Sequence, residues 1–266
     1  MDKQSVLNGL STYEIGKHLE LFDRIDSTNS YLKREALRGL PHGAVALAES
    51  QTGGRGRLGR SFSSPEGKGI YCSVLLRPNV PPVEAVDLTS YTAVALCDGI
   101  EKVTGSRPRI KWTNDLVMGG KKICGVLCEM SIAPDGSLQH VVIGFGVNVN
   151  QTPDEWPEEL KAIAGSVSEV VGHEVLREKL TAELLNSLDE VYHNWLLGKR
   201  EGYLEQYRKD CLTLGREIKV IRAGREEAAF AEDIDEGFGL IVRHPDGRRE
   251  TVTSGEVSVR GLYGYI

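Results

Sequence analysis

The most unusual segment of the 266-residue chain is GGRGRLGR at residues 53–60, where four glycines alternate with three arginines. Glycines allow several backbone N–H groups to converge on an anion, and arginines form bidentate contacts with phosphate. The segment is not a P-loop, because no G-K-[ST] follows, and no G-x-G-x-x-G opens a helix. Its spacing alone leaves two alternatives open, an anion-binding loop and a solvated loop without a role.

A second polar cluster is KWTND at residues 111–115, at the end of an expected strand. Ligands commonly dock at strand ends of sheets flanked by helices. Asp115 could hold Mg²⁺, and Lys111 could face a phosphate. Taken alone, however, the cluster is better explained as a polar strand end with a local salt bridge.

Two further features lie on expected strands. Lys122 precedes an apolar run and could either extend its head to water or face a developing negative charge, while Lys121 points the other way. In GFGVN at residues 144–148, two glycines within a buried strand indicate either a close ligand or a bulge, and Asn148 offers an amide. With no apparent nucleophile, the clusters together favour phosphoryl or nucleotidyl chemistry.

These clusters must be positioned by alternating helices and strands. Hydrophobic periodicity predicts helices over 29–38 (capped by Ser27 or Thr28), 83–104, 158–171 and 176–197. It predicts strands over 44–50, from 70 onward, over 141–150, and as a hairpin turning at 119–120. From about residue 214 the pattern changes to short alternating strands with Gly and Asp turns. We therefore expect one sheet with helices, followed by a small β-barrel of about 50 residues.

Composition excludes several classes of protein. The chain is 40% hydrophobic and 26% charged with a net charge of −6, which argues against an obligate nucleic-acid or anionic-membrane binder. It contains no apolar run of roughly 18 residues and no signal-peptide pattern at its start, so we expect a cytoplasmic protein. The five cysteines and six histidines show no metal-binding spacing.

The order of five sequence blocks resembles that of the biotin–protein ligases. The blocks are DSTN at 26–29, GGRGRLGRSFSSPEGKGIYCS from 53, KWTNDL from 111, KKICGVLCE from 121 and GFGVNVN from 144. The resemblance covers nearly the whole chain from about residue 13. It implies an α+β fold, with a mixed sheet flanked by helices in a class II synthetase-like catalytic domain (1–212) and an SH3-like C-terminal domain (213–266).

The resemblance also implies a two-step reaction that uses ATP, biotin and Mg²⁺. Biotin would be activated as biotinyl-5'-AMP and transferred to a lysine of the biotin carboxyl carrier domain of a biotin-dependent carboxylase. The enzyme would thus be a biotin–[biotin carboxyl-carrier protein] ligase. Two other readings are a lipoate or octanoate protein ligase and a nonenzymatic RNA-binding module that uses the Gly/Arg loop and the barrel.

Site residues follow from the positions that match the family's motifs. Lys122 and Arg57 would be catalytic, and Asp115 would bind the metal. The residues that would bind biotin are Ser27, Thr28, Asn29, Gln51, Gly54, Arg55, Gly56, Arg57, Lys122, Gly125, Gly144 and Gly146. Those that would bind ATP are Arg57, Arg60, Lys111, Asn114, Asn148, Trp156 and Arg260.

Bifunctional members of that family carry a DNA-binding domain of about 60 residues before the DSTN block. Only 25 residues precede Asp26, so the resemblance implies a monofunctional ligase that binds no DNA and no membrane. Some members pair through their sheet edges, which leaves both a monomer and a homodimer open.

Overall fold

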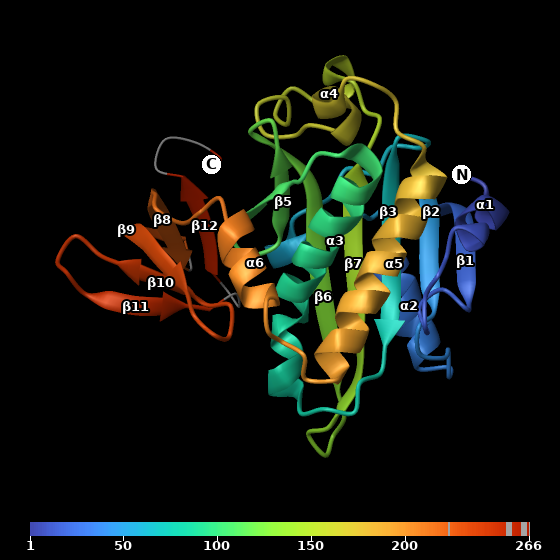
Figure 1. Cartoon of the computed structure of the whole chain (residues 1–266), viewed down its shortest axis with the longest axis horizontal. Coiled ribbons are helices and arrows are strands. Elements are labelled where there is room, and N and C mark those ends of the chain that lie inside the picture. Colours follow the sequence, from blue (N-terminus) through green and yellow to red (C-terminus); the bar gives the residue numbers. More distant parts are fainter. Residues whose placement is uncertain (223, 254–256, 262–264, 266) are drawn as a thin grey trace.

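The first part of the computed structural model is a seven-stranded sheet (Figure 1), and the structure describes residues 1–222, 224–253, 257–261 and 265. The strands are β1 (Leu19–Ile25), β2 (Val45–Gln51), β3 (Gly69–Leu76), β4 (Arg109–Lys111), β5 (Asp115–Met118), β6 (Lys121–Ile132) and β7 (Leu138–Asn148). Their spatial order is β1-β2-β3-β7-β6-β5-β4. Only the β1–β2 pair is parallel among the strand pairs of this sheet, so the sheet is mixed, as expected.

Helices cover both faces of this sheet. They are α1 (Lys3–Asn8), α2 (Thr28–Ala36), α3 (Leu88–Thr104), α4 (Val167–Val171), α5 (Arg177–Leu196) and α6 (Tyr203–Asp210). The long helices α3 and α5 lie together on one face, and α2 lies on the other (Figure 1). The apolar side of α2, with Leu32 and Ala36, packs on Ala46, Leu75 and Val142 of the sheet. The larger core lies beneath α3 and α5.

Helix α2 begins as the sequence predicts. Ser27 has extended backbone angles, and its hydroxyl accepts a hydrogen bond from the Ser30 N–H, as an N-cap residue does. The cap therefore fixes where Thr28 and Asn29, the first residues of the helix, point.

Three predicted elements differ in the structure. The expected helix 83–104 is a 3-10 turn, η2 (Pro82–Asp87), followed by α3. The expected helix 158–171 was wrong except for α4, because the backbone of Ile163 and Gly165 bonds instead with Lys122 at the start of β6. Helix α6 was not predicted, and the expected hairpin strand before 119 is split into β4 and β5 at residues 112–114.

The C-terminal part is a five-stranded antiparallel sheet. Its strands are β8 (Glu217–Arg222), β9 (Arg225–Ile234), β10 (Leu240–Arg243), β11 (Arg249–Val252) and β12 (Val257–Gly261), in the order β11-β10-β9-β8-β12. It lies beside β5 and α6 (Figure 1). The strand-rich pattern from about 214 is confirmed, while the SH3-like assignment stays a prediction.

The two sheets are joined through Phe238. Its carbonyl accepts a hydrogen bond of 2.9 Å from the Trp112 indole, and its ring packs edge-on against Tyr91 and Tyr207. Arg208 of α6 also donates to the Ile234 carbonyl. Residue 112 adjoins the KWTND cluster, so these contacts connect the second sheet to the candidate site. In the described residues, every helix is too short or too polar to cross a membrane.

Candidate active site

One cavity of about 630 Å³ collects the sequence-predicted site residues, and this volume is typical of a small-molecule site. All of them line it except Gly54 and Arg260. Gly54 packs on Gln51 at the cavity edge, and Arg260 lies on β12 with its side chain outside the part that the structure describes. The wall also includes Lys219, Glu226, Val259, Gly261 and Tyr265 of the C-terminal part.

The end of the cavity nearest α2 is a connected set of hydrogen bonds. The Gln51 side-chain carbonyl accepts from the Thr28 N–H (2.9 Å), and the Gln51 amide N–H donates to Ser64 (3.0 Å). The buried Ser73 hydroxyl lies 2.7 Å from Thr28 Oγ1 and 2.5 Å from Asn29 Oδ1. Each of these polar groups is buried or partly buried, and each has a partner that fixes its orientation. The arrangement suits a neutral ligand that both donates and accepts hydrogen bonds.

Glycines in β7 and β6 are needed because other groups approach them closely. A Cβ atom at Gly144 would collide with the Asn29 amide, and one at Gly146 would collide with the ring of Phe62. At Gly125 a Cβ would lie 3.2 Å from Lys122 Nζ. A close approach therefore explains Gly144 and Gly146, but the approaching groups are the Asn29 and Phe62 side chains, and an approach by a ligand stays a prediction.

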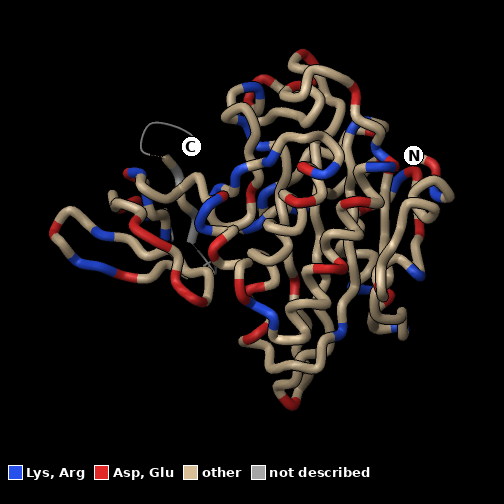
Figure 2. Tube along the Cα trace, viewed as in Figure 1, with Lys and Arg blue, Asp and Glu red and all other residues tan. Residues whose placement is uncertain are grey.

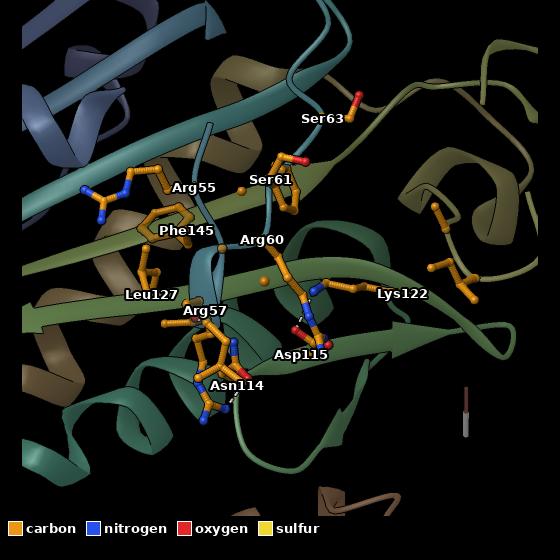
Figure 3. Close-up of a pocket in the computed structure, with 18 of the residues that line it drawn as sticks. Arg55, Arg57, Arg60, Ser61, Ser63, Asn114, Asp115, Lys122, Leu127 and Phe145 are labelled. Carbon is orange, nitrogen blue, oxygen red and sulfur yellow. Dashed lines mark hydrogen bonds and ion pairs between the residues drawn. The ribbon is translucent and has the colours of Figure 1, made fainter. Parts of the chain in front are cut away.

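Lys122 and Asp115 form an ion pair inside the cavity, with 2.6 Å between Nζ and Oδ1 (Figure 3). The Tyr265 hydroxyl donates to the other carboxylate oxygen at 2.7 Å, and Lys111 Nζ lies 3.4 Å from the centre of the Tyr265 ring. Burial would raise the pKa of Asp115, but the charge and hydrogen bond of Lys122 outweigh it and hold that pKa below its usual range. Asp115 is therefore an anion between two lysines.

The glycine-arginine loop, residues 53–60, contributes Arg55, Gly56, Arg57, Leu58 and Arg60 to the cavity wall. Arg57 donates to the Asn114 side-chain oxygen at 3.0 Å, and the Asn114 amide in turn donates to the Val126 carbonyl. Arg55 extends away from the Arg57–Asn114 pair (Figure 3) and lies 3.4 Å from Glu129. Burial lowers the pKa of Arg57, but an arginine stays charged near neutral pH. The loop thus brings fixed positive charge to the cavity.

Asn148 and Trp156 have mainly structural contacts here. Asn148 is buried, and its amide donates to the carbonyls of Gly165 (3.0 Å) and Lys122 (3.4 Å). Trp156 is 5% exposed, and its buried indole N–H has no hydrogen-bond partner in the described structure. Asn148 therefore fixes the backbone that carries Lys122, while Trp156 contributes an apolar wall.

Among the residues that sequence reasoning missed are Phe62 and Tyr265, which line the cavity, and Ser64, Ser73 and Glu129, which hydrogen-bond to residues that line it. Ser73 lies on β3 and Glu129 on β6. A polar side chain on a strand that is otherwise apolar could have marked each of them as a candidate site residue. Tyr265 offered no signal, because 150 residues separate it from Asp115.

The described residues contain no group of three His, Cys, Asp or Glu side chains suited to a metal ion. Asp115 and Glu226 are the acidic residues that line the cavity. One carboxylate is still enough for Mg²⁺ that arrives with a nucleotide, because substrate phosphates and water supply the remaining ligands.

Comparison with known proteins assigns the class. Residues 21–148 match the model of the biotin/lipoate A/B protein ligase family, and residues 213–260 match that of the biotin protein ligase C-terminal domain. The biotin–[acetyl-CoA-carboxylase] ligase of Paracoccus denitrificans is 34% identical over 254 residues, which cover 90% of this chain and 99% of that protein. The chain therefore belongs to the biotin/lipoate A/B protein ligase family.

Several relatives within this family are named as biotin ligases, and others as bifunctional ligase/repressors. The bifunctional ligase/repressor BirA of Bacillus subtilis is 37% identical over 74% of this chain, and the match spans 60% of that relative's length. The biotin protein ligase of Aquifex aeolicus, solved in complex with biotin and ATP, superposes with a TM-score of 0.76. The two chains are 28% identical, and the superposition covers 92% of this chain and 99% of the Aquifex chain.

Proposed function

We propose that the protein is a biotin protein ligase that joins biotin, through biotinyl-5'-AMP, to a lysine of a biotin carboxyl carrier domain. The observation that carries this proposal is a single cavity that connects a hydrogen-bonding end to an ion-paired lysine and an arginine loop. Relatives that are named biotin–[acetyl-CoA-carboxylase] ligases support biotin as the substrate and a carboxylase as the origin of the acceptor.

The biotin head group would occupy the end near α2. Its ureido ring is neutral and has two N–H donors and one carbonyl acceptor, so it needs short polar side chains that are already oriented. Thr28, Asn29 and Gln51 supply such groups, and Ser73 holds two of them in place. A ligand without the ureido ring would offer no partner to the hydrogen-bonding positions that these groups still have available, and each unmade bond in a buried site costs about 1–3 kcal/mol.

In the first step a biotin carboxylate oxygen would attack the α-phosphorus of ATP, and pyrophosphate would leave. Lys122 lines the cavity, and its charge would offset the repulsion between carboxylate and phosphate. Arg57, Arg60, Lys111 and Asn114 would contact the nucleotide. Asp115 would hold the Mg²⁺ that accompanies ATP, and the ion would supply positive charge beside the phosphates.

In the second step the lysine amine of the acceptor would attack the acyl carbon, and AMP would leave. The amine loses a proton in this step, and Lys122 would polarise the acyl carbonyl. Residues 53–60 would cover the mixed anhydride and keep water from it.

We also propose that the catalytic domain is residues 1–212 and the C-terminal domain 213–266, and that Arg260 and Trp156 bind nucleotide.

The alternatives predict different behaviour. A lipoate ligase would have less use for the polar end of the cavity, and an RNA-binding module would concentrate basic residues. Figure 2 shows Lys and Arg mixed with Asp and Glu in both parts of the described chain. We therefore propose that the protein binds no DNA or RNA specifically, which fluorescence anisotropy with labelled duplex DNA and RNA at low salt would test.

The experiment that tests the function is ATP–pyrophosphate exchange with Mg²⁺ and either biotin, lipoate or no acid. Exchange that depends on biotin is expected, followed by transfer of labelled biotin to a purified carrier domain. Exchange with lipoate only would assign the protein to lipoate ligation, and no exchange with either acid would refute the ligase proposal.

A further inference from the structure

We propose that Glu129 is a positioning residue that connects the biotin-recognising amide of Asn29 to the glycine-arginine loop through Arg55. The inference rests on the proposed function and adds a specific residue to it. Glu129 lies on β6, seven residues beyond Lys122, and does not line the cavity itself. Its effect on the reaction would therefore pass through its two partners.

Three side chains from two segments, Asn29 and Lys33 of α2 and Arg55 of the loop, converge on this carboxylate. Asn29 Nδ2 donates to one oxygen at 3.0 Å, Lys33 Nζ lies 2.8 Å from the other, and Arg55 Nη2 lies 3.4 Å from that same second oxygen. The Glu129 side chain is 17% exposed, whereas those of Lys33 and Arg55 are 41% and 48% exposed. The carboxylate is thus the partly buried centre of the cluster.

The first consequence concerns the orientation of the Asn29 amide. Its N–H₂ group faces Glu129 and the Leu127 carbonyl, both acceptors, while its oxygen faces the Ser73 hydroxyl. A flipped amide would place oxygen against a carboxylate, which is unfavourable. Glu129 therefore determines which end of Asn29 a ligand meets, and Gly144 leaves the space that this amide needs.

The second consequence concerns the loop. Within it, Gly56 N–H donates to the Arg60 carbonyl at 2.7 Å and Phe62 N–H to the Gly54 carbonyl at 2.9 Å, so it is a compact turn. Arg57 holds this turn to Asn114, and Arg55 holds it to Glu129. Asn114 lies in the connection between β4 and β5, and Glu129 lies on β6, so the loop is attached to the sheet at two separate points.

The charge of Glu129 supports both contacts. Burial would raise the pKa of its carboxyl, but hydrogen bonds from Lys33 and Asn29 outweigh that effect, and its pKa lies below the usual range. Near neutral pH it is therefore a carboxylate. A glutamine at this position would keep the shape and a hydrogen-bond acceptor but would lose the negative charge.

Two substitutions separate the two roles. In Glu129→Gln the acceptor for Asn29 remains while the attraction for Arg55 is lost, so the dissociation constant for biotin should stay within about twofold. Bound biotinyl-AMP, preformed with labelled biotin and chased with unlabelled biotin, should be lost about tenfold faster. In Glu129→Leu the acceptor is lost as well, and biotin affinity should fall about tenfold. Unchanged retention in Glu129→Gln would overturn the inference.

A double-mutant cycle identifies the partner. Glu129→Gln should speed the loss of biotinyl-AMP in the wild-type background but not in a protein that already carries Arg55→Met. An equal increase in both backgrounds would overturn the role of Arg55. Lys33→Met is the matched control, because it removes the other cation and leaves Arg55 in place, so retention should not change. Melting temperatures check folding of every variant. Failure of the wild type to form biotinyl-AMP would refute the proposed function instead.

Discussion

The Lys122 ammonium lies 2.6 Å from the Asp115 carboxylate, so the cation that would meet biotin is already paired with the group that would meet the metal. The two residues lie on adjacent strands, where Lys122 of β6 is paired with Val117 and Asp115 of β5 with Gly125. The ion pair neutralises both charges in a partly buried cavity before substrates bind. Substrate binding would replace it with two contacts, one between Lys122 and biotin and one between Asp115 and the metal.

Replacing Lys122 with alanine should reduce biotin-dependent pyrophosphate exchange by at least about 100-fold, because the carboxylate would approach phosphate without a cation. Lys121→Ala is the matched control. The adjacent lysine points to Glu169 at 2.7 Å on the other side of the strand, and its loss should leave exchange unchanged. Near-normal exchange by Lys122→Ala would count against its catalytic role.

Gly144→Ala should abolish tight biotin binding with a moderate loss of stability, because the new methyl group displaces the Asn29 amide. Forcing one methyl group into a packed site costs about 1–3 kcal/mol. Isothermal titration with biotin and thermal unfolding would measure the two effects. Gly237→Ala, where the nearest other atom would be 3.6 Å away, is the control that should change neither.

Tyr265→Phe should lower the KM for MgATP by about three- to tenfold while leaving biotin affinity unchanged. The phenol donates to the Asp115 oxygen that Mg²⁺ would need, and phenylalanine removes this competitor while keeping a ring near Lys111. Steady-state kinetics at saturating biotin would show the change. A higher KM would mean that the hydroxyl assists nucleotide binding.

Asp87 predicts a pH-dependent stability effect outside the cavity. Burial raises the pKa of its carboxyl to about 6, against an N–H bond from Trp195 that lowers it. A folded-state pKa above the unfolded one means that stability is lost as pH rises from about 4 to about 6. Asp87→Asn should therefore stabilise the protein at pH 7.5 by about 1–2 kcal/mol, after allowance for solvent screening.

The stabilisation by Asp87→Asn should shrink as the pH falls below about 6 and approach zero near pH 3, below the ordinary aspartate pKa of about 3.9, where the wild-type carboxyl is mostly protonated in both states. Urea unfolding at several pH values would measure it. Asp23→Asn, at an exposed position on β1, is the control that should show no such trend. A constant difference across the pH range would contradict the assignment of Asp87.

Local patterns were sufficient for the elements that hold the site. The Ser27 cap, the buried runs of β2 and β3 and the glycines of β7 each depend on neighbours in sequence, and the structure agrees with them. The cavity likewise brings together residues from five blocks that were identified one by one.

Contacts between distant segments could not be predicted in the same way. Residues 157–165 gave a helical pattern, yet their backbone bonds to Lys122 on β6, which no local preference indicates. Glu129 and Ser73 have no local pattern that links them to a site. Their role depends on Asn29, whose amide group hydrogen-bonds to both side chains. The network behind the expected contact residues therefore depends on tertiary structure.

Phe238 has a left-handed backbone with φ of 61°, which is unfavourable for a bulky residue by roughly 1–2 kcal/mol. That conformation presents its carbonyl to Trp112, beside Lys111. The two sheets should consequently unfold in a single calorimetric transition. An exchange of the C-terminal part between homologues would have to preserve the turn that contains Phe238.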